Sequence, residues 1–70
     1  MNKKILKELV KARKKQIVEM ELIKEFQEQR LEEDLDEKEE VQIKNSISQI
    51  EETLPQLKEI YSFLKDYDTE

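Results

Sequence analysis

The most regular feature of the chain is the hydrophobic pattern of its second half. From Ile43 onward, apolar side chains recur at alternating spacings of four and three residues, the spacing of a helix that packs along one narrow seam. The seam positions are Ile43, Ile47, Ile50, Leu54, Leu57, Tyr61 and Leu64. Because the pattern is unbroken, it predicts one long helix that packs against a second helix.

The first half of the chain repeats this spacing less regularly. Apolar seam positions are Leu6, Val10, Ile17, Met20 and Leu31, and Arg13, Lys24 and Gln27 occupy the positions between them. Each half also has apolar residues outside its seam. A helix that is apolar on more than one side is usually buried on more than one side. We therefore expect self-association through these extra residues, which are Val18, Leu22, Phe26, Ile60, Phe63 and Tyr67.

The turn between the two halves is expected in the acidic segment 32–38, where the first seam has ended. Asp36 followed by Glu39 has the spacing of a helix start signal. We therefore predict one helical-hairpin domain over residues 1–70. Helix one covers about 3–33 with Asn2 as its N-cap, the acidic turn covers 34–36, and helix two covers 37–67. Because the chain has no glycine, Asp34 or Asp36 is expected to supply the backbone conformations that glycine usually adopts in a turn.

Two arms of equal length predict an all-α fold, an antiparallel two-helix hairpin. Folding the arms back places Met20 beside Ile50 and Ile23 beside Ile47, so that apolar side chains meet. A single hairpin of this size has a marginal core and leaves the extra apolar residues exposed. We expect two hairpins to pair into a homodimeric four-helix bundle. The alternative is that a different protein covers the same residues.

The single proline of the chain, Pro55, lies inside the regular seam of helix two. Proline removes one helical hydrogen bond and crowds the carbonyl four residues earlier. Two alternatives follow. Helix two kinks at residues 51–55 and continues, or it ends near Thr53 and a new helix begins with Pro55 in its first turn. The seam keeps its phase across Pro55, which favours the kink.

Composition argues against catalysis. The chain has no histidine, the usual general base and the commonest zinc ligand, and no cysteine for thiolate chemistry or disulfides. The acidic turn also lacks the glycine of an EF-hand calcium loop. We expect no enzyme activity, no cofactor, no metal and no small-molecule substrate. The basic start is followed by no long apolar run, so we expect neither a signal peptide nor a membrane span, and a cytoplasmic location.

Charge is distributed unevenly along the chain, whose net charge is −5. Residues 1–15 are strongly basic and residues 19–40 strongly acidic. The residues predicted to contact a partner are Lys7, Lys11, Lys14, Lys15, Glu33, Asp34, Asp36 and Glu37. The expected function is that of a small protein-binding regulator, adaptor or inhibitor that acts through a helical-bundle surface. The alternatives are a dimer that binds nucleic acid through its basic N-terminal helix residues, and a structural coiled-coil protein.

Overall fold

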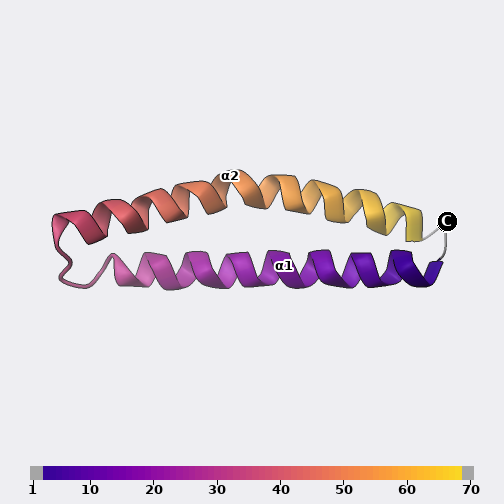
Figure 1. Ribbon diagram of the computed structural model, residues 1–70, viewed down its shortest axis with the longest axis horizontal. Coiled ribbons are helices and arrows are strands. Elements are labelled where there is room, and N and C mark those ends of the chain that lie inside the picture. The colour runs from indigo at the N-terminus through magenta and orange to yellow at the C-terminus, as the bar shows by residue number, and fades with distance from the viewer. Residues whose placement is uncertain (1–2, 69–70) are drawn as a thin grey trace.

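The protein folds as two long antiparallel helices that lie side by side (Figure 1). The computed structural model describes residues 3–68, so the expected N-cap Asn2 lies outside the described residues. Helix α1 covers Lys3–Arg30 and α2 covers Glu37–Asp68, and the described chain contains no strand. The Cα atoms extend over 51 × 15 × 13 Å. The predicted all-helical hairpin is confirmed.

The core is the seam between the helices. Its buried side chains all occupy the four-and-three spacing of the sequence: Leu6, Ile17, Ile43, Ile50, Leu54 and Leu57. Ile17 packs with Ile50, Leu54 and Leu57, and Met20 and Tyr61 lie partly buried against this cluster. Each buried aliphatic side chain contributes about 1.5–3 kcal/mol relative to an exposed one. The hairpin is therefore held together by one narrow apolar strip.

Two residues expected to make cross-helix contacts, Met20 and Ile23, differ in burial. Met20 packs at the Ile50 cluster, as the fold-back predicts. Ile23 was expected beside Ile47, but its side chain is 46% exposed. The α1 seam runs through Met20, Lys24 and Gln27. Ile23 precedes Lys24 by one residue, so its side chain points about 100° away from that of Lys24 around the helix. At that level the helices are instead joined by Gln27, whose Nε2 donates to Ser46 Oγ at 3.4 Å.

The C-terminus of α1 comes three residues before the expected end at Glu33. Leu31 N still donates to Gln27 O at 3.2 Å, in the α-helical pattern. Glu32 N and Glu33 N donate to carbonyls three residues back instead, at 3.1 and 3.0 Å. The helix thus tightens into a 3₁₀-type turn before the chain leaves it. Asp34 and Asp36 are both non-helical, as expected, but no described residue has a positive φ, so neither adopts the left-handed conformation that glycine often supplies.

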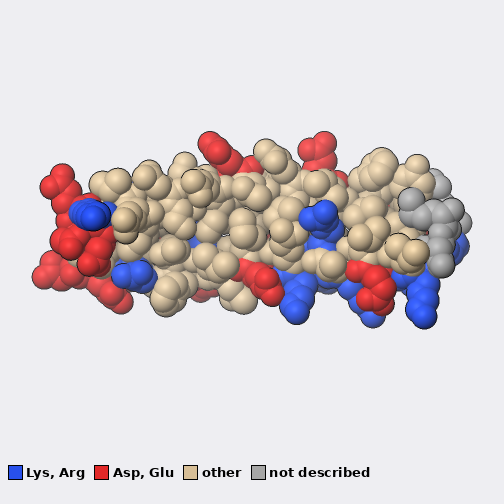
Figure 2. Space-filling view, in the orientation of Figure 1, with Lys and Arg blue, Asp and Glu red and all other residues tan. Residues whose placement is uncertain are grey.

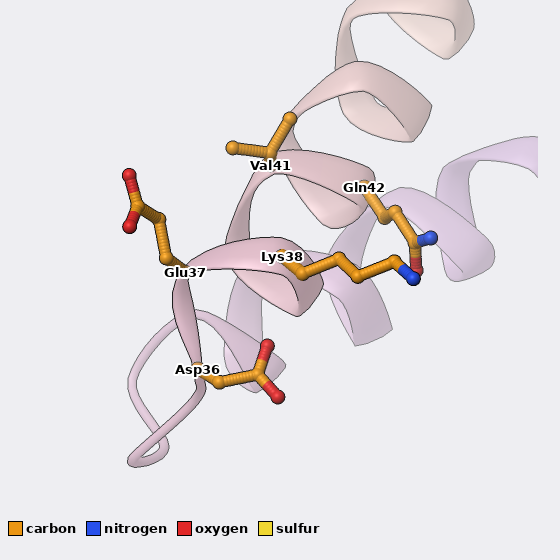
Figure 3. Close-up of a pocket in the computed structure, with 5 residues that line it drawn as sticks. All are labelled: Asp36, Glu37, Lys38, Val41 and Gln42. Carbon is orange, nitrogen blue, oxygen red and sulfur yellow. The ribbon is translucent and has the colours of Figure 1, made fainter.

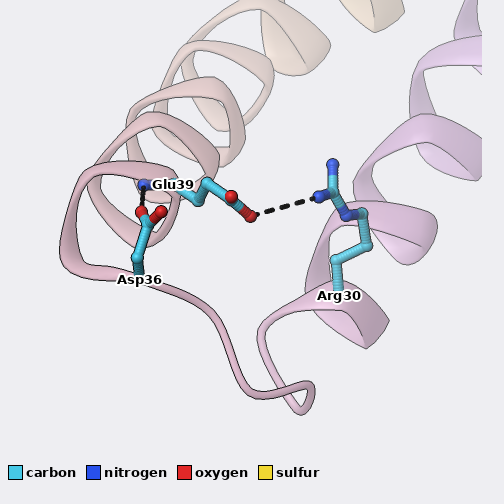
Figure 4. Close-up of polar contacts among 3 residues, drawn as sticks. All are labelled: Arg30, Asp36 and Glu39. Carbon is cyan, nitrogen blue, oxygen red and sulfur yellow. Dashed lines mark hydrogen bonds and ion pairs between the residues drawn. The ribbon is translucent and has the colours of Figure 1, made fainter.

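The N-terminus of α2 is capped as the sequence predicts, and α2 begins at the expected Glu37. Glu39 N donates to Asp36 Oδ1 at 2.8 Å, and Glu40 N donates to Asp36 O at 3.0 Å. The carboxylate of Glu39 points away from the cap, with Oε2 at 3.8 Å from Arg30 Nη2 (Figure 4). Asp36 therefore starts the second helix, and Glu39 links that start to the end of the first.

Helix α2 continues through Pro55 and ends at Asp68, one residue beyond the expected Tyr67. The alternative in which helix two stops near Thr53 is therefore wrong. Figure 1 shows α2 gently bowed, with its convex side away from α1. Close to the proline, Thr53 Oγ1 donates to Gln49 O at 2.8 Å. Such back-bonding bends helices in the same way that a missing proline donor does. A local kink at Pro55 itself stays a prediction.

Candidate interaction surface

One long edge of the hairpin is lined with charged side chains that pair with each other. Lys58 Nζ lies 3.5 Å from Glu21 Oε1, and Lys24 Nζ lies 3.6 Å from Glu51 Oε1, so both pairs join α1 to α2. These side chains are between about one third and more than one half exposed, and such pairs contribute at most about 1 kcal/mol. This edge, with its paired charges, is suited to contact with water.

The opposite flank of the seam on α2 has a different composition. On that side, where Ser46 meets Gln27, residues again follow the four-and-three spacing, one step round the helix from the buried seam. None of them is charged. They are Gln42, Ser46, Gln49, Thr53, Gln56, Ile60, Phe63 and Tyr67. In a chain that is 44% charged, eight uncharged positions along one stripe need a physical reason.

Helix α1 has a matching stripe beside its own seam, with Glu19 as its charged member. It consists of Ile5, Leu9, Ala12, Gln16, Glu19, Ile23 and Phe26. In an antiparallel helix pair, equivalent flanks of the two seams come to the same side. The two stripes therefore form one surface, which we call the uncharged face. Figure 2 shows uncharged side chains covering most of both helices, with acidic side chains gathered at the turn end.

Large apolar side chains of the uncharged face are exposed. Phe63 is 62% exposed, Phe26 is 60% exposed and Ile5 is 58% exposed. Phe63 and Tyr67 contact each other edge to face, with ring centroids 5.1 Å apart and an angle of 62° between the planes. The aromatic pair is thus held in place while one side of it stays open, as expected for a contact site.

The structure brings together most of the residues predicted to mediate self-association. Phe26, Ile60, Phe63 and Tyr67 lie on the uncharged face. Leu22 borders this face, whereas Val18 lies further round α1, and both are exposed, at 59% and 47%.

Several residues of this surface were missed by the sequence reasoning: Ile5, Leu9, Ala12 and Ile23. Their signal was present in the sequence as a second four-and-three pattern that ends at Phe26. The polar residues Gln16 and Glu19 interrupt this apolar pattern and make it harder to recognise.

Shallow hollows indent the described surface at both ends of the hairpin. One is lined by Lys4, Ile5, Glu8, Leu9 and Ala12, so its apolar part belongs to the uncharged face of α1. The other lies at the first turns of α2 and is lined by Asp36, Glu37, Lys38, Val41 and Gln42. Figure 3 shows Glu37 and Val41 pointing to one side of the helix and Lys38 and Gln42 to the other. The lining side chains therefore diverge and do not converge on a common point.

The predicted partner-binding residues lie in two separate groups. Lys7, Lys11, Lys14 and Lys15 are exposed on the first half of α1, far from the turn. The exposed acidic group, which is Glu33, Asp34, Asp36 and Glu37, lies in the turn and at the start of α2. The structure does not bring the two groups together. The hairpin is instead electrically polar along its length, acidic at the turn and basic on the far part of α1 (Figure 2).

Residues 3–68 contain no candidate metal site and no candidate membrane span. No three acidic, histidine or cysteine side chains of this part of the chain are grouped so that they could hold a metal ion. Neither described helix combines the length and apolarity that a membrane crossing requires.

The chain matches no protein-family model, no curated protein and no solved structure. The uncharged face is therefore the feature on which a functional argument can be built.

Proposed function

We propose that this protein is a small protein-binding regulator, adaptor or inhibitor that acts without catalysis. It packs the uncharged face of its hairpin against another polypeptide, either a second copy or a different protein, and completes a helical bundle. The observation that carries the proposal is the exposure of Phe26, Ile60, Phe63 and Tyr67 together on one face of a highly charged chain. A solvent-facing surface would be expected to carry charges there, as the opposite edge does.

The composition of the uncharged face suits a protein interface. Burying an exposed phenylalanine or isoleucine in a contact contributes about 1.5–3 kcal/mol, and aromatic residues are common binding hot spots. The glutamine, serine and threonine residues between them can form hydrogen bonds with a partner. Burying such neutral groups costs much less than burying charges, which lose their hydration. A partner helix can therefore lie along the whole stripe.

The experiment compares three tagged baits in an extract of the source organism: the natural chain, Phe63→Glu and Ser62→Glu. Ser62 is the exposed neighbour of Phe63 on the outer side of α2 and serves as the matched control. We expect the natural chain and Ser62→Glu to retain the same protein, which can be untagged copies of this chain. Phe63→Glu should retain at least about tenfold less, while circular dichroism shows both variants to be helical. Equal retention by the three baits, or no retained protein at all, would overturn the proposal.

A further inference from the structure

We propose that the uncharged face binds a second copy of this chain, with the turns of the two hairpins at opposite ends of the assembly. This inference rests on the proposed function and selects one partner and one orientation. A two-fold axis perpendicular to the helices then runs between the two faces. Helix α1 lies along the partner's α1, and α2 lies along the partner's α2, each pair antiparallel.

The size of the face fits a stable dimer. Figure 2 looks down the shortest axis, so the face has the two longer Cα extents, 51 and 15 Å. Its footprint is on the order of 800 Å², which is about the area that each partner contributes to a standard protein interface. A single short peptide would cover only part of this length, whereas a second hairpin covers all of it.

Helix α1 is complementary to itself in this orientation. In a two-fold interface, a side chain on one side of the axis contacts the partner's residues that lie at the same distance on the other side. A protruding side chain therefore needs a recess at that equivalent distance. The middle of α1 lies near Gln16. Phe26 protrudes about 15 Å from that point towards the turn, at 1.5 Å per residue. The hollow at Ile5 and Leu9 lies about 10–17 Å from it in the other direction.

The partner's Phe26 therefore reaches the hollow at Ile5 and Leu9, and Ile23 comes beside the partner's Leu9. Ala12 leaves room for the longer side chain of Glu19 of the other copy, whose carboxylate can reach the edge. Gln16 approaches Gln16 of the second copy close to the axis, where two amides can bond to each other.

Charge also selects the orientation with opposite turns. It places the basic first half of α1 beside the acidic second half of the partner's α1, which leads into the acidic turn. With both turns at one end, the two acidic turns would adjoin each other. Like charges at close range disfavour such pairing, and opposite charges favour the other orientation. The predicted dimer should therefore weaken as salt is added, whereas a dimer with adjacent turns should strengthen.

The test begins with sedimentation equilibrium of the full chain, for which we expect twice the 8.5 kDa mass of one copy. Orientation is then measured between spin labels. The chain has no cysteine, so each introduced cysteine is labelled alone. Asp34→Cys in the exposed turn should give an interlabel distance of roughly 50 Å, close to the 51 Å length of the hairpin. Gln16→Cys should give a short distance, because its two copies meet at the axis.

Lys14→Cys is the matched control, because it is exposed near the same level of α1 but on the side away from the uncharged face. Its labels should be clearly further apart than those at Gln16. A short Asp34 distance, or affinity that rises with salt, overturns the inference in favour of adjacent turns. A monomeric mass at high micromolar concentration also overturns it. Face-dependent capture of a different protein would in that case leave the proposed function standing, whereas loss of all face-dependent binding would remove both.

Discussion

Replacing Pro55 with alanine should stabilise the protein. Pro55 is exposed, so its ring contributes nothing to the buried seam, and α2 continues on both sides of it. Proline has no amide hydrogen for the carbonyl of Glu51 and costs about 3 kcal/mol relative to alanine in a helix interior. Helix α2 is bowed (Figure 1), and bending of a helix at a proline relieves part of this cost. We therefore expect Pro55→Ala to raise the free energy of unfolding by about 2–3 kcal/mol.

The measurement is thermal and urea unfolding followed by circular dichroism. For a chain of this length, 1 kcal/mol corresponds to about 4–8 °C in Tm, so the expected increase is roughly 10–20 °C. Stability of an associating chain depends on protein concentration, so all variants are compared at one concentration. Ser62→Ala is the matched control, because Ser62 occupies the same exposed helical position as Pro55, two turns later. It should gain only about 0.5 kcal/mol.

Two results would contradict this reasoning. Equal gains in Pro55→Ala and Ser62→Ala would mean that α2 has no local cost at the proline. A loss of stability would mean that the bow is needed for the packing of Leu54 and Leu57, and that a straighter helix separates them from Ile17. Sedimentation of the same variant tests whether the proline directs the last turns of α2, with Ile60, Phe63 and Tyr67, toward a second contact. An unchanged mass and unchanged partner binding would exclude that role.

Four further outcomes follow from the packing, the cap and the charge distribution. Leu57→Ala should cost about 2–5 kcal/mol and abolish most helical circular dichroism, whereas the exposed control Glu59→Ala should stay folded. Asp36→Ala should lower the free energy of unfolding by about 0.5–2 kcal/mol in urea titrations, and Asp36→Asn should retain most of the cap. Gln27→Leu should raise the free energy of unfolding by about 1 kcal/mol, because the change removes Oε1, a buried acceptor without a hydrogen-bond partner in the described structure. A lower free energy of unfolding would show that the bond from Gln27 to Ser46 matters more. Gel shifts with RNA and duplex DNA at low salt should show no complex, and a complex that dissociates as salt rises would instead support the nucleic-acid alternative.

The seam and the start of α2 could be predicted from the sequence because both depend on near neighbours. The four-and-three spacing places Leu54 and Leu57 on one side of a helix whatever the partner helix is. The Asp36 cap needs only a backbone amide three residues later, which Glu39 supplies. The end of α1 was harder to predict from the sequence. No glycine or proline marks it, and the change to carbonyls three residues back at Glu32 and Glu33 depends on how the chain reaches α2.

The sequence by itself determined two helices, their common seam and the acidic turn between them, because hydrophobic spacing and capping act over a few residues. Only the tertiary structure decided which flank of each seam lies on the same side. Ile5 and Phe63 belong to one surface because the antiparallel fold brings residues far apart in the chain to the same face. The same fold places two charged pairs, Glu21 with Lys58 and Lys24 with Glu51, on the opposite edge. The α1 stripe is interrupted by Gln16 and Glu19 and does not stand out in the sequence. In the fold it lies beside the uncharged stripe of α2, and the two stripes form one surface.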